Sequence, residues 1–93
     1  MQFIVIEHFR DGNPRPAYRR FAEEGRHCPD GMDVLNSWVD VGFGRCFMLI
    51  ECADAALIQQ WSAAWSDVVH IEIVPVVPSK VAAEALAPFL DGD

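Results

Sequence analysis

The sequence predicts one α+β domain built from four strands and two helices, followed by a short C-terminal helix. Residues 2–9 form a run rich in Phe, Ile and Val, and residues 34–52 alternate and turn like a β-hairpin. Two segments with helical spacing of apolar residues, 14–24 and 54–67, lie between the strands. A chain of 93 residues, 52% of them hydrophobic, has the size and composition of a single globular domain.

The first strand, residues 2–9, gives way to a helix at a clear boundary. Asn13 suits the N-cap of that helix, and Pro14 suits its first position. We expect the helix to reach Glu24, where Gly25 is suited to end it. Its apolar side is formed by Ala17, Tyr18, Phe21 and Ala22.

The hairpin is expected to pair residues 34–41 with residues 44–52. Gly42 and Phe43 would form a two-residue turn of type II′, because glycine suits the first position of that turn. Asp40 then opposes Arg45, and Trp38 opposes Phe47. A three-residue turn that includes Gly44 is the alternative, and it would move Asp40 to the other phase.

Side chains of a strand alternate between the two faces of a sheet, so the hairpin has two different faces. The ordinary apolar face carries Leu35, Ser37, Val39, Cys46, Met48, Ile50 and Cys52. The other face mixes large aromatic side chains with charges: Asn36, Trp38, Asp40, Arg45, Phe47, Leu49 and Glu51.

The second helix follows an N-capping Asp54 and runs to about residue 67. Its apolar stripe consists of Leu57, Trp61, Ala64, Trp65 and Val68, which places both tryptophans in the core. A fourth strand spans residues 69–77, and its Pro75 favours an edge position. Ser79 would cap a C-terminal helix near residues 80–87. The single domain, residues 1–93, therefore has its core at 1–78 and a tail helix at 79–90.

The order β-α-β-β-α-β is that of a ferredoxin-like fold. Right-handed crossovers place both helices on one face of a four-stranded antiparallel sheet. Insertion of the first strand between the third and the fourth gives the strand order four-one-three-two. The other face of the sheet then has no helix to cover it.

Compact apolar side chains are assigned to the face beneath the helices: Ile4, Ile6, Leu35, Val39, Cys46, Met48, Ile50, Ile71 and Ile73. The helix-free face then holds Phe3, Val5, Glu7, Asn36, Trp38, Asp40, Arg45, Phe47, Leu49, Glu51, His70, Glu72, Val74 and Val76. That is a larger apolar patch than soluble monomers usually expose. A second copy of the sheet is the simplest cover, so we expect a homodimer that forms a dimeric α/β barrel.

Several segments carry a family resemblance. They are Phe-Ile-Val-Ile-Glu-His-Phe, Arg-Phe-Ala-Glu-Glu-Gly-Arg, Ser-Trp-Val, Arg-Cys-Phe-Met-Leu-Ile-Glu-Cys, Trp-x3-Trp-Ser-Asp and Glu-Ile-Val-Pro-Val-Val. Over residues 1–78 the chain resembles a family of small bacterial proteins known as domain of unknown function 3303. The resemblance implies a ferredoxin-like fold of the dimeric α/β-barrel superfamily. It implies no established activity, cofactor or catalytic residue, and the chemistry of that superfamily is too varied to choose one.

Glu7, Arg45 and Glu72 are expected at one end of the helix-free face. Two carboxylates beside an arginine could anchor an acidic ligand or hold a proton-transfer group, whereas the alternative is an ion-pair network in the dimer. Trp38 and Phe47 could stack on a flat organic ligand or pack in the interface. The candidate ligand-binding residues are thus Glu7, Trp38, Arg45, Phe47, Glu51 and Glu72, with no catalytic residue assigned.

Composition excludes several classes of function. The net charge of -7 argues against nucleic-acid binding, which requires a basic surface. No segment has the length of a membrane span. The three cysteines, Cys28, Cys46 and Cys52, form no CxxC pair, which favours a reducing compartment, the cytoplasm. His27 and Cys28 alone do not make a metal site, so we expect no metal or cofactor.

Two functions remain open. The first is a dimer that binds or transforms a small organic molecule on the helix-free face of the sheet. The second is a structural or interaction domain whose sheet face serves only for self-association.

Overall fold

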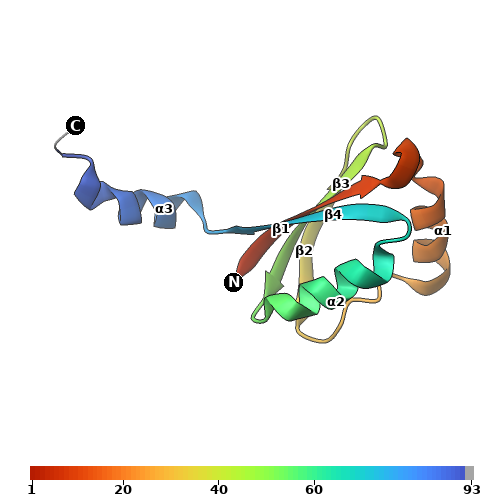
Figure 1. The fold of residues 1–93 in the computed structure, drawn as a ribbon. Coiled ribbons are helices and arrows are strands. Elements are labelled where there is room, and N and C mark those ends of the chain that lie inside the picture. Colours follow the sequence, from red (N-terminus) through yellow and green to blue (C-terminus); the bar gives the residue numbers. More distant parts are fainter. Residues whose placement is uncertain (92–93) are drawn as a thin grey trace.

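The computed structural model describes residues 1–91 and shows a sheet with two helices beside it and a helical arm (Figure 1). The predicted α+β class and element order are confirmed. In chain order the elements are β1 Gln2–Phe9, the 3-10 turn η1 Arg10–Gly12, α1 Arg15–Glu24, β2 Met32–Val39, β3 Arg45–Cys52, α2 Ala55–Trp65, β4 Val69–Val76, α3 Ser79–Leu86 and the 3-10 turn η2 Ala87–Phe89.

The sheet has the strand order β2-β3-β1-β4, and each neighbouring pair is antiparallel. This is the predicted order four-one-three-two. Pro75 lies in the edge strand β4, where its missing N–H costs no ladder hydrogen bond to a further strand. Both α1 and α2 lie on the same side of the sheet, which leaves the opposite face without a helix (Figure 1).

The predicted faces of β1 were wrong. Phe3 pairs with Ile50 and Val5 pairs with Met48, so these side chains share the helix-covered face and are almost completely buried. Glu7 follows them onto that face opposite Cys46. Both phases of this strand are apolar, so alternation alone could not decide which one points at the helices.

The other phase of β1 lies on the helix-free face. Ile4, Ile6 and His8 pair there with Leu49, Phe47 and Arg45, respectively. We call the helix-free set the open face: Gln2, Ile4, Ile6, His8, Asp33, Asn36, Trp38, Arg45, Phe47, Leu49, Glu51, His70, Glu72, Val74 and Val76.

The predicted hairpin register is confirmed, because Trp38 pairs with Phe47 and Asp40 N donates to Arg45 O at 2.8 Å. The turn type differs from the prediction. Phe43 N donates to Asp40 O at 2.8 Å, and Phe43 itself adopts the left-handed conformation with φ 61°. Gly42 therefore does not supply the positive φ that a type II′ turn requires at its first position.

A bulge in β2 changes the position of Leu35. The pairing with β3 shifts between Val34 and Asn36, so two residues of β2 span one step of its neighbour. Leu35, predicted for the core, is instead 52% exposed. The bulge restores the predicted phase for Ser37 and Val39, which share a face with Met48 and Cys46.

The core contribution of α2 comes from Ile58, Trp61 and Trp65. The prediction that both tryptophans are buried is confirmed, whereas Ala64 is exposed and the fully buried Ile58 was missed. Asp54 caps the helix as predicted, because its Oδ1 accepts from Ala56 N at 2.9 Å.

The C-terminal helix stands apart from the domain as an arm (Figure 1). Every described residue after Val76 is exposed, and the molecule extends 54 × 31 × 18 Å. Ser79 was predicted as the N-cap, but that position belongs to Pro78, and no side chain caps the helix. The helix ends at Leu86, close to the predicted residue 87, and the chain continues as the 3-10 turn η2.

Candidate functional site

A cavity of about 250 Å³ lies between the helices and the helix-covered face of the sheet. It borders β1, β2, β3, both helices of the domain and the loop after α1. Its walls are formed by Glu7, Phe9, Ala17, Tyr18, Phe21, Arg26, Ser37, Val39, Cys46, Met48, Trp61 and Trp65. An apolar cavity of about 150 Å³ already accommodates benzene, so this space is large enough for a substituted ring.

The cavity exists because α1 does not pack closely against the sheet. Ala17 is the only buried residue of that helix, and its small side chain leaves room beneath it. Tyr18 and Phe21 are exposed on one side and line the cavity on the other. The Tyr18 ring lies 5.9 Å from the ring of Phe9, which fixes one wall.

Glu7 is the acidic group of the cavity. Burial raises the pKa of its carboxyl group, and the Cys46 thiol and the charge of Arg26 oppose that rise only in part. Among the described residues, Glu7 has no salt-bridge partner. A carboxyl group in such surroundings can take up and release a proton closer to neutral pH than an exposed one.

Cys46 lies directly opposite Glu7 on β3. Burial, the nearby charge of Glu7 and the hydrogen bond between the two side chains raise the pKa of the Cys46 thiol to about 12. The thiol therefore stays protonated at neutral pH and donates to Glu7. This fits the predicted position of Cys46 beneath the helices, and a protonated thiol is a poor nucleophile.

Arg26 is the cation of the cavity. Its backbone carbonyl accepts hydrogen bonds from the indole nitrogens of Trp61 at 2.8 Å and Trp65 at 3.0 Å. Its Nη2 donates to Ser37 Oγ at 3.1 Å, and its guanidinium lies 5.2 Å from the centre of the Phe21 ring. Four side chains thus position this arginine, which has no salt-bridge partner in the described part of the chain.

A family profile described as Domain of unknown function (DUF3303) matches residues 1–90. The chain belongs to this family. No curated protein and no solved structure matches it.

The predicted cluster of Glu7, Arg45 and Glu72 is not brought together in this DUF3303 chain. Arg45 and Glu72 lie on the open face, whereas Glu7 faces the helices. Arg45 Nε contacts Asp40 Oδ2 at 3.0 Å, as expected for residues opposite each other in the hairpin. Glu72 Oε1 instead contacts His8 Nε2 at 2.5 Å.

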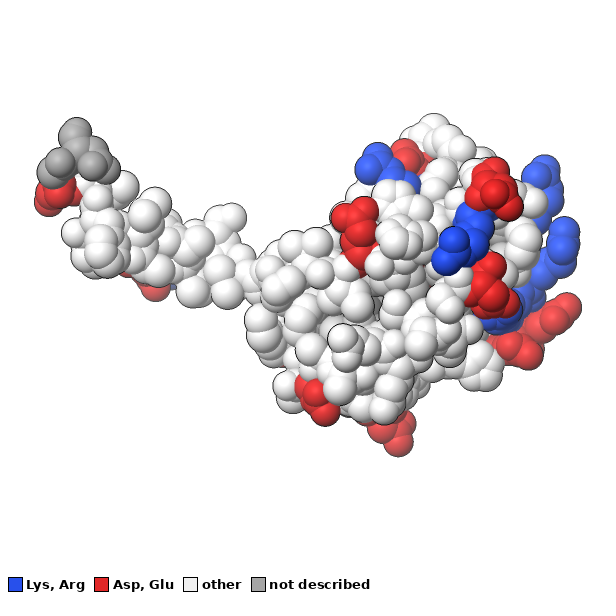
Figure 2. Space-filling model, in the orientation of Figure 1, with Lys and Arg blue, Asp and Glu red and all other residues white. Residues whose placement is uncertain are grey.

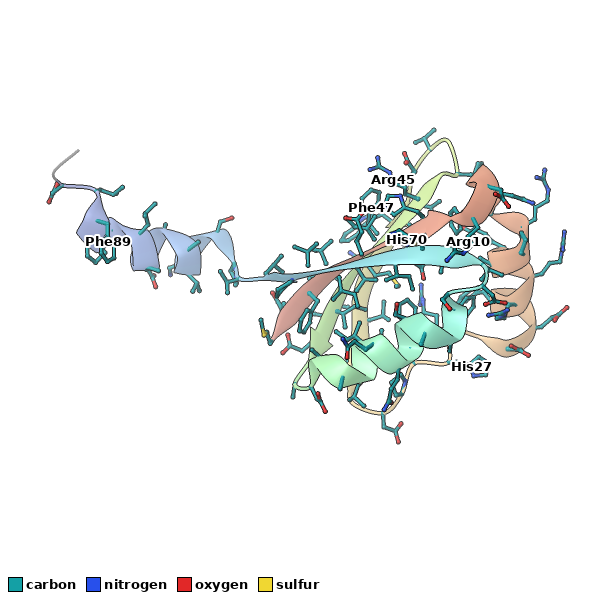
Figure 3. All side chains as sticks on the ribbon, in the orientation of Figure 1. Arg10, His27, Arg45, Phe47, His70 and Phe89 are labelled. Atoms are coloured by element: carbon teal, nitrogen blue, oxygen red, sulfur yellow. The ribbon has the colours of Figure 1, made fainter. Side chains whose placement is uncertain are left out.

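The other candidates are spread along the open face. Arg45 and Phe47 lie on the side of the sheet away from α2, with the guanidinium 5.0 Å from the ring centre (Figure 3). Trp38 is 51% exposed beside Phe47. Glu51 lies toward the opposite end of the sheet, where it contacts the Met1 amino group at 2.7 Å. These side chains do not line the cavity.

The cavity itself was missed at the level of sequence, although one signal for it was present. Phe3, Val5 and Phe9 form an apolar phase of β1 that is interrupted only by Glu7. A single acid within a buried phase is a strong indication of a functional or hydrogen-bonded group. Arg26 lies in a loop and carries no comparable pattern.

Within residues 1–91, no three His, Cys, Asp or Glu side chains are placed to hold a metal ion. No described helix is long and apolar enough to cross a membrane.

Proposed function

We propose that this protein binds a small planar organic acid in the cavity and that Glu7 exchanges a proton with it. The observation that carries the proposal is a largely buried carboxyl group that has no ion-pair partner among residues 1–91 and lies beside aromatic side chains. Ligand sites in proteins typically combine such apolar walls with a few placed polar groups.

The roles of the polar groups follow from their chemistry. Arg26 offers a fixed guanidinium for a carboxylate or an enolate oxygen of the ligand. Glu7 in its protonated form donates to the ligand, and in its ionised form it removes a proton from an acidic carbon or oxygen. Both side chains border one cavity, so a single small molecule can contact both.

The test uses benzoate and benzyl alcohol as probes, since they share a ring and differ in charge. Binding is measured by protein NMR, with the Trp61 and Trp65 indole signals as reporters. We expect benzoate to bind better than benzyl alcohol, and to bind more tightly as the pH falls and Glu7 becomes protonated. Glu7→Gln should bind benzoate with little dependence on pH.

Arg26→Met should lose the preference for benzoate, whereas Glu51→Gln on the open face is the matched control and should behave like the wild type. The proposal is wrong if neither probe shifts the cavity signals. It is also wrong if Glu7→Gln keeps the pH dependence of the wild type.

We further propose that the protein is a homodimer through the open face. This is the self-association function that the sequence suggested. Its support is the exposure of Trp38 and Val74 beside a row of partly covered apolar side chains of the open face. Monomers rarely leave such a patch uncovered. A monomeric mass by light scattering at micromolar concentration would reject this dimer.

All three cysteines are free, and two of them are buried. A protein without disulfides is typical of a reducing compartment, so we propose the cytoplasm as its location.

A further inference from the structure

The arm formed by α3 and η2 carries an apolar side that no residue within 1–91 covers. Val81, Leu86, Phe89 and Leu90 are all exposed, and Phe89 is 71% exposed. Figure 3 shows Phe89 on the arm, well away from the sheet and from α1 and α2. An isolated helix of eight residues is not stable in water, so this arm needs a partner to persist.

The apolar side of the arm is continuous. Val81, Ala85 and Phe89 recur every four residues, and Ala82 and Leu86 lie beside them. The opposite side carries Lys80, Ala83, Glu84 and Ala87. In space-filling view the arm has few charged side chains, whereas charges gather around the α1 end of the molecule (Figure 2).

The area of the open face supports a second copy of this chain as the partner of the arm. Four strands of eight residues cover about 19 × 26 Å, or roughly 500 Å² for each copy. Two such faces bury about 1,000 Å², which is at the lower limit for a stable interface. A helix about 12 Å long from each copy would bring the interface into the usual range.

The position and charge of the arm support the same partner. The arm continues directly from β4, which contributes His70, Glu72 and Val74 to the open face, so it lies next to the proposed interface. It carries one Lys against Glu84 and Asp91, and it therefore lacks the basic character that favours an anionic membrane surface.

We propose that α3 of each copy packs its apolar side against the body of the other copy, so that the dimer is held by exchanged arms. The proposal rests on the homodimer but not on ligand binding in the cavity. It assigns a partner to residues 79–90, which the open-face contact alone leaves in solvent.

Lys80 gives a direct test, because it is the only lysine of the chain and lies on the polar side of the arm. An amine-reactive photocrosslinker then attaches only to Lys80 and to the N-terminal amino group. Dimers are prepared from an equal mixture of ¹⁴N-labelled and ¹⁵N-labelled full chains, and crosslinked peptides are read by mass spectrometry. Lys80→Arg removes the lysine and serves as the control.

We expect peptides that join Lys80 of one isotope to residues 1–76 of the other. Crosslinks only within one isotope would show that the arm packs on its own body and would overturn the proposal. If the dimers show no crosslink from Lys80 to residues 1–76 of either copy, the arm lies in solvent. That result would also overturn the proposal.

A matched pair of variants tests the side of the helix that packs. Ala85→Glu places a charge on the apolar side, and Ala83→Glu makes the same substitution on the polar side. We expect Ala85→Glu to weaken dimerisation at least tenfold in sedimentation and Ala83→Glu to change it less than threefold. Equal effects of the two substitutions on dimerisation would contradict the proposal. Benzoate binding measured on the same variants reports separately whether the cavity is intact.

Discussion

At the scale of single residues, Glu7 is the acidic side chain of the cavity beneath the helices. It lies between buried strand residues rather than on the open face, and burial is the main cause of its raised pKa. A raised pKa in the folded state means that the folded protein binds protons more readily than the unfolded chain does. Folding stability from this group is therefore greatest at low pH and decreases as the pH rises through the folded-state pKa.

Glu7→Gln should remove this pH dependence. The variant keeps the shape of the side chain and its ability to accept from Cys46, but it carries no charge to bury. We expect its free energy of unfolding, measured in urea, to rise relative to that of the wild type between about pH 4.5 and pH 8. Glu51→Gln is the control. Parallel stability curves for wild type and Glu7→Gln would show that Glu7 is not desolvated.

At the scale of elements, α2 was the easiest to predict and β1 the hardest. The repeat of Trp61 and Trp65 specifies one side of a helix, and both are buried as predicted. β1 has apolar residues in both phases, so only its tertiary pairing shows which phase faces the helices. The bulge at Leu35 likewise depends on pairing with β3, and no local residue signals it.

The two indoles of α2 also donate hydrogen bonds to the backbone carbonyl of Arg26 and so fix its loop. Substitutions of Trp61 should therefore separate the packing of the ring from its hydrogen bond. Trp61→Ala should cost about 3–5 kcal/mol, as expected for a large core truncation. Trp61→Phe keeps most of the packing and loses the donor to Arg26 O, so it should cost about 1–2 kcal/mol.

Chemical denaturation measures both values. Trp61→Phe should also weaken benzoate binding, since Arg26 then keeps only Trp65 as a donor to its carbonyl. Equal stability of Trp61→Ala and the wild type would contradict the buried position of this side chain.

At the scale of the whole molecule, the chain is too extended for its length. Its radius of gyration is 16.0 Å, whereas a compact domain of this size has about 12 Å. The difference in radius of gyration comes from the arm, whose apolar side is uncovered. The open face is a second apolar surface that no element covers. A dimer would cover both, and it explains why a domain of 93 residues carries apolar groups on two faces of one sheet.

Leu49 tests this dimer because it lies on the open face, between Ile4 and Asn36 on the neighbouring strands. Leu49→Asp would place an uncompensated charge in the interface, at a cost of several kcal/mol, and should give a monomer by light scattering. Val41→Asp makes a similar change at the hairpin tip, where Val41 is 97% exposed, and should remain dimeric. Circular dichroism should show the same fold for both variants. A dimer that survives Leu49→Asp but dissociates with Ala85→Glu would mean that the arms alone hold two copies together and that the open face lies outside the interface.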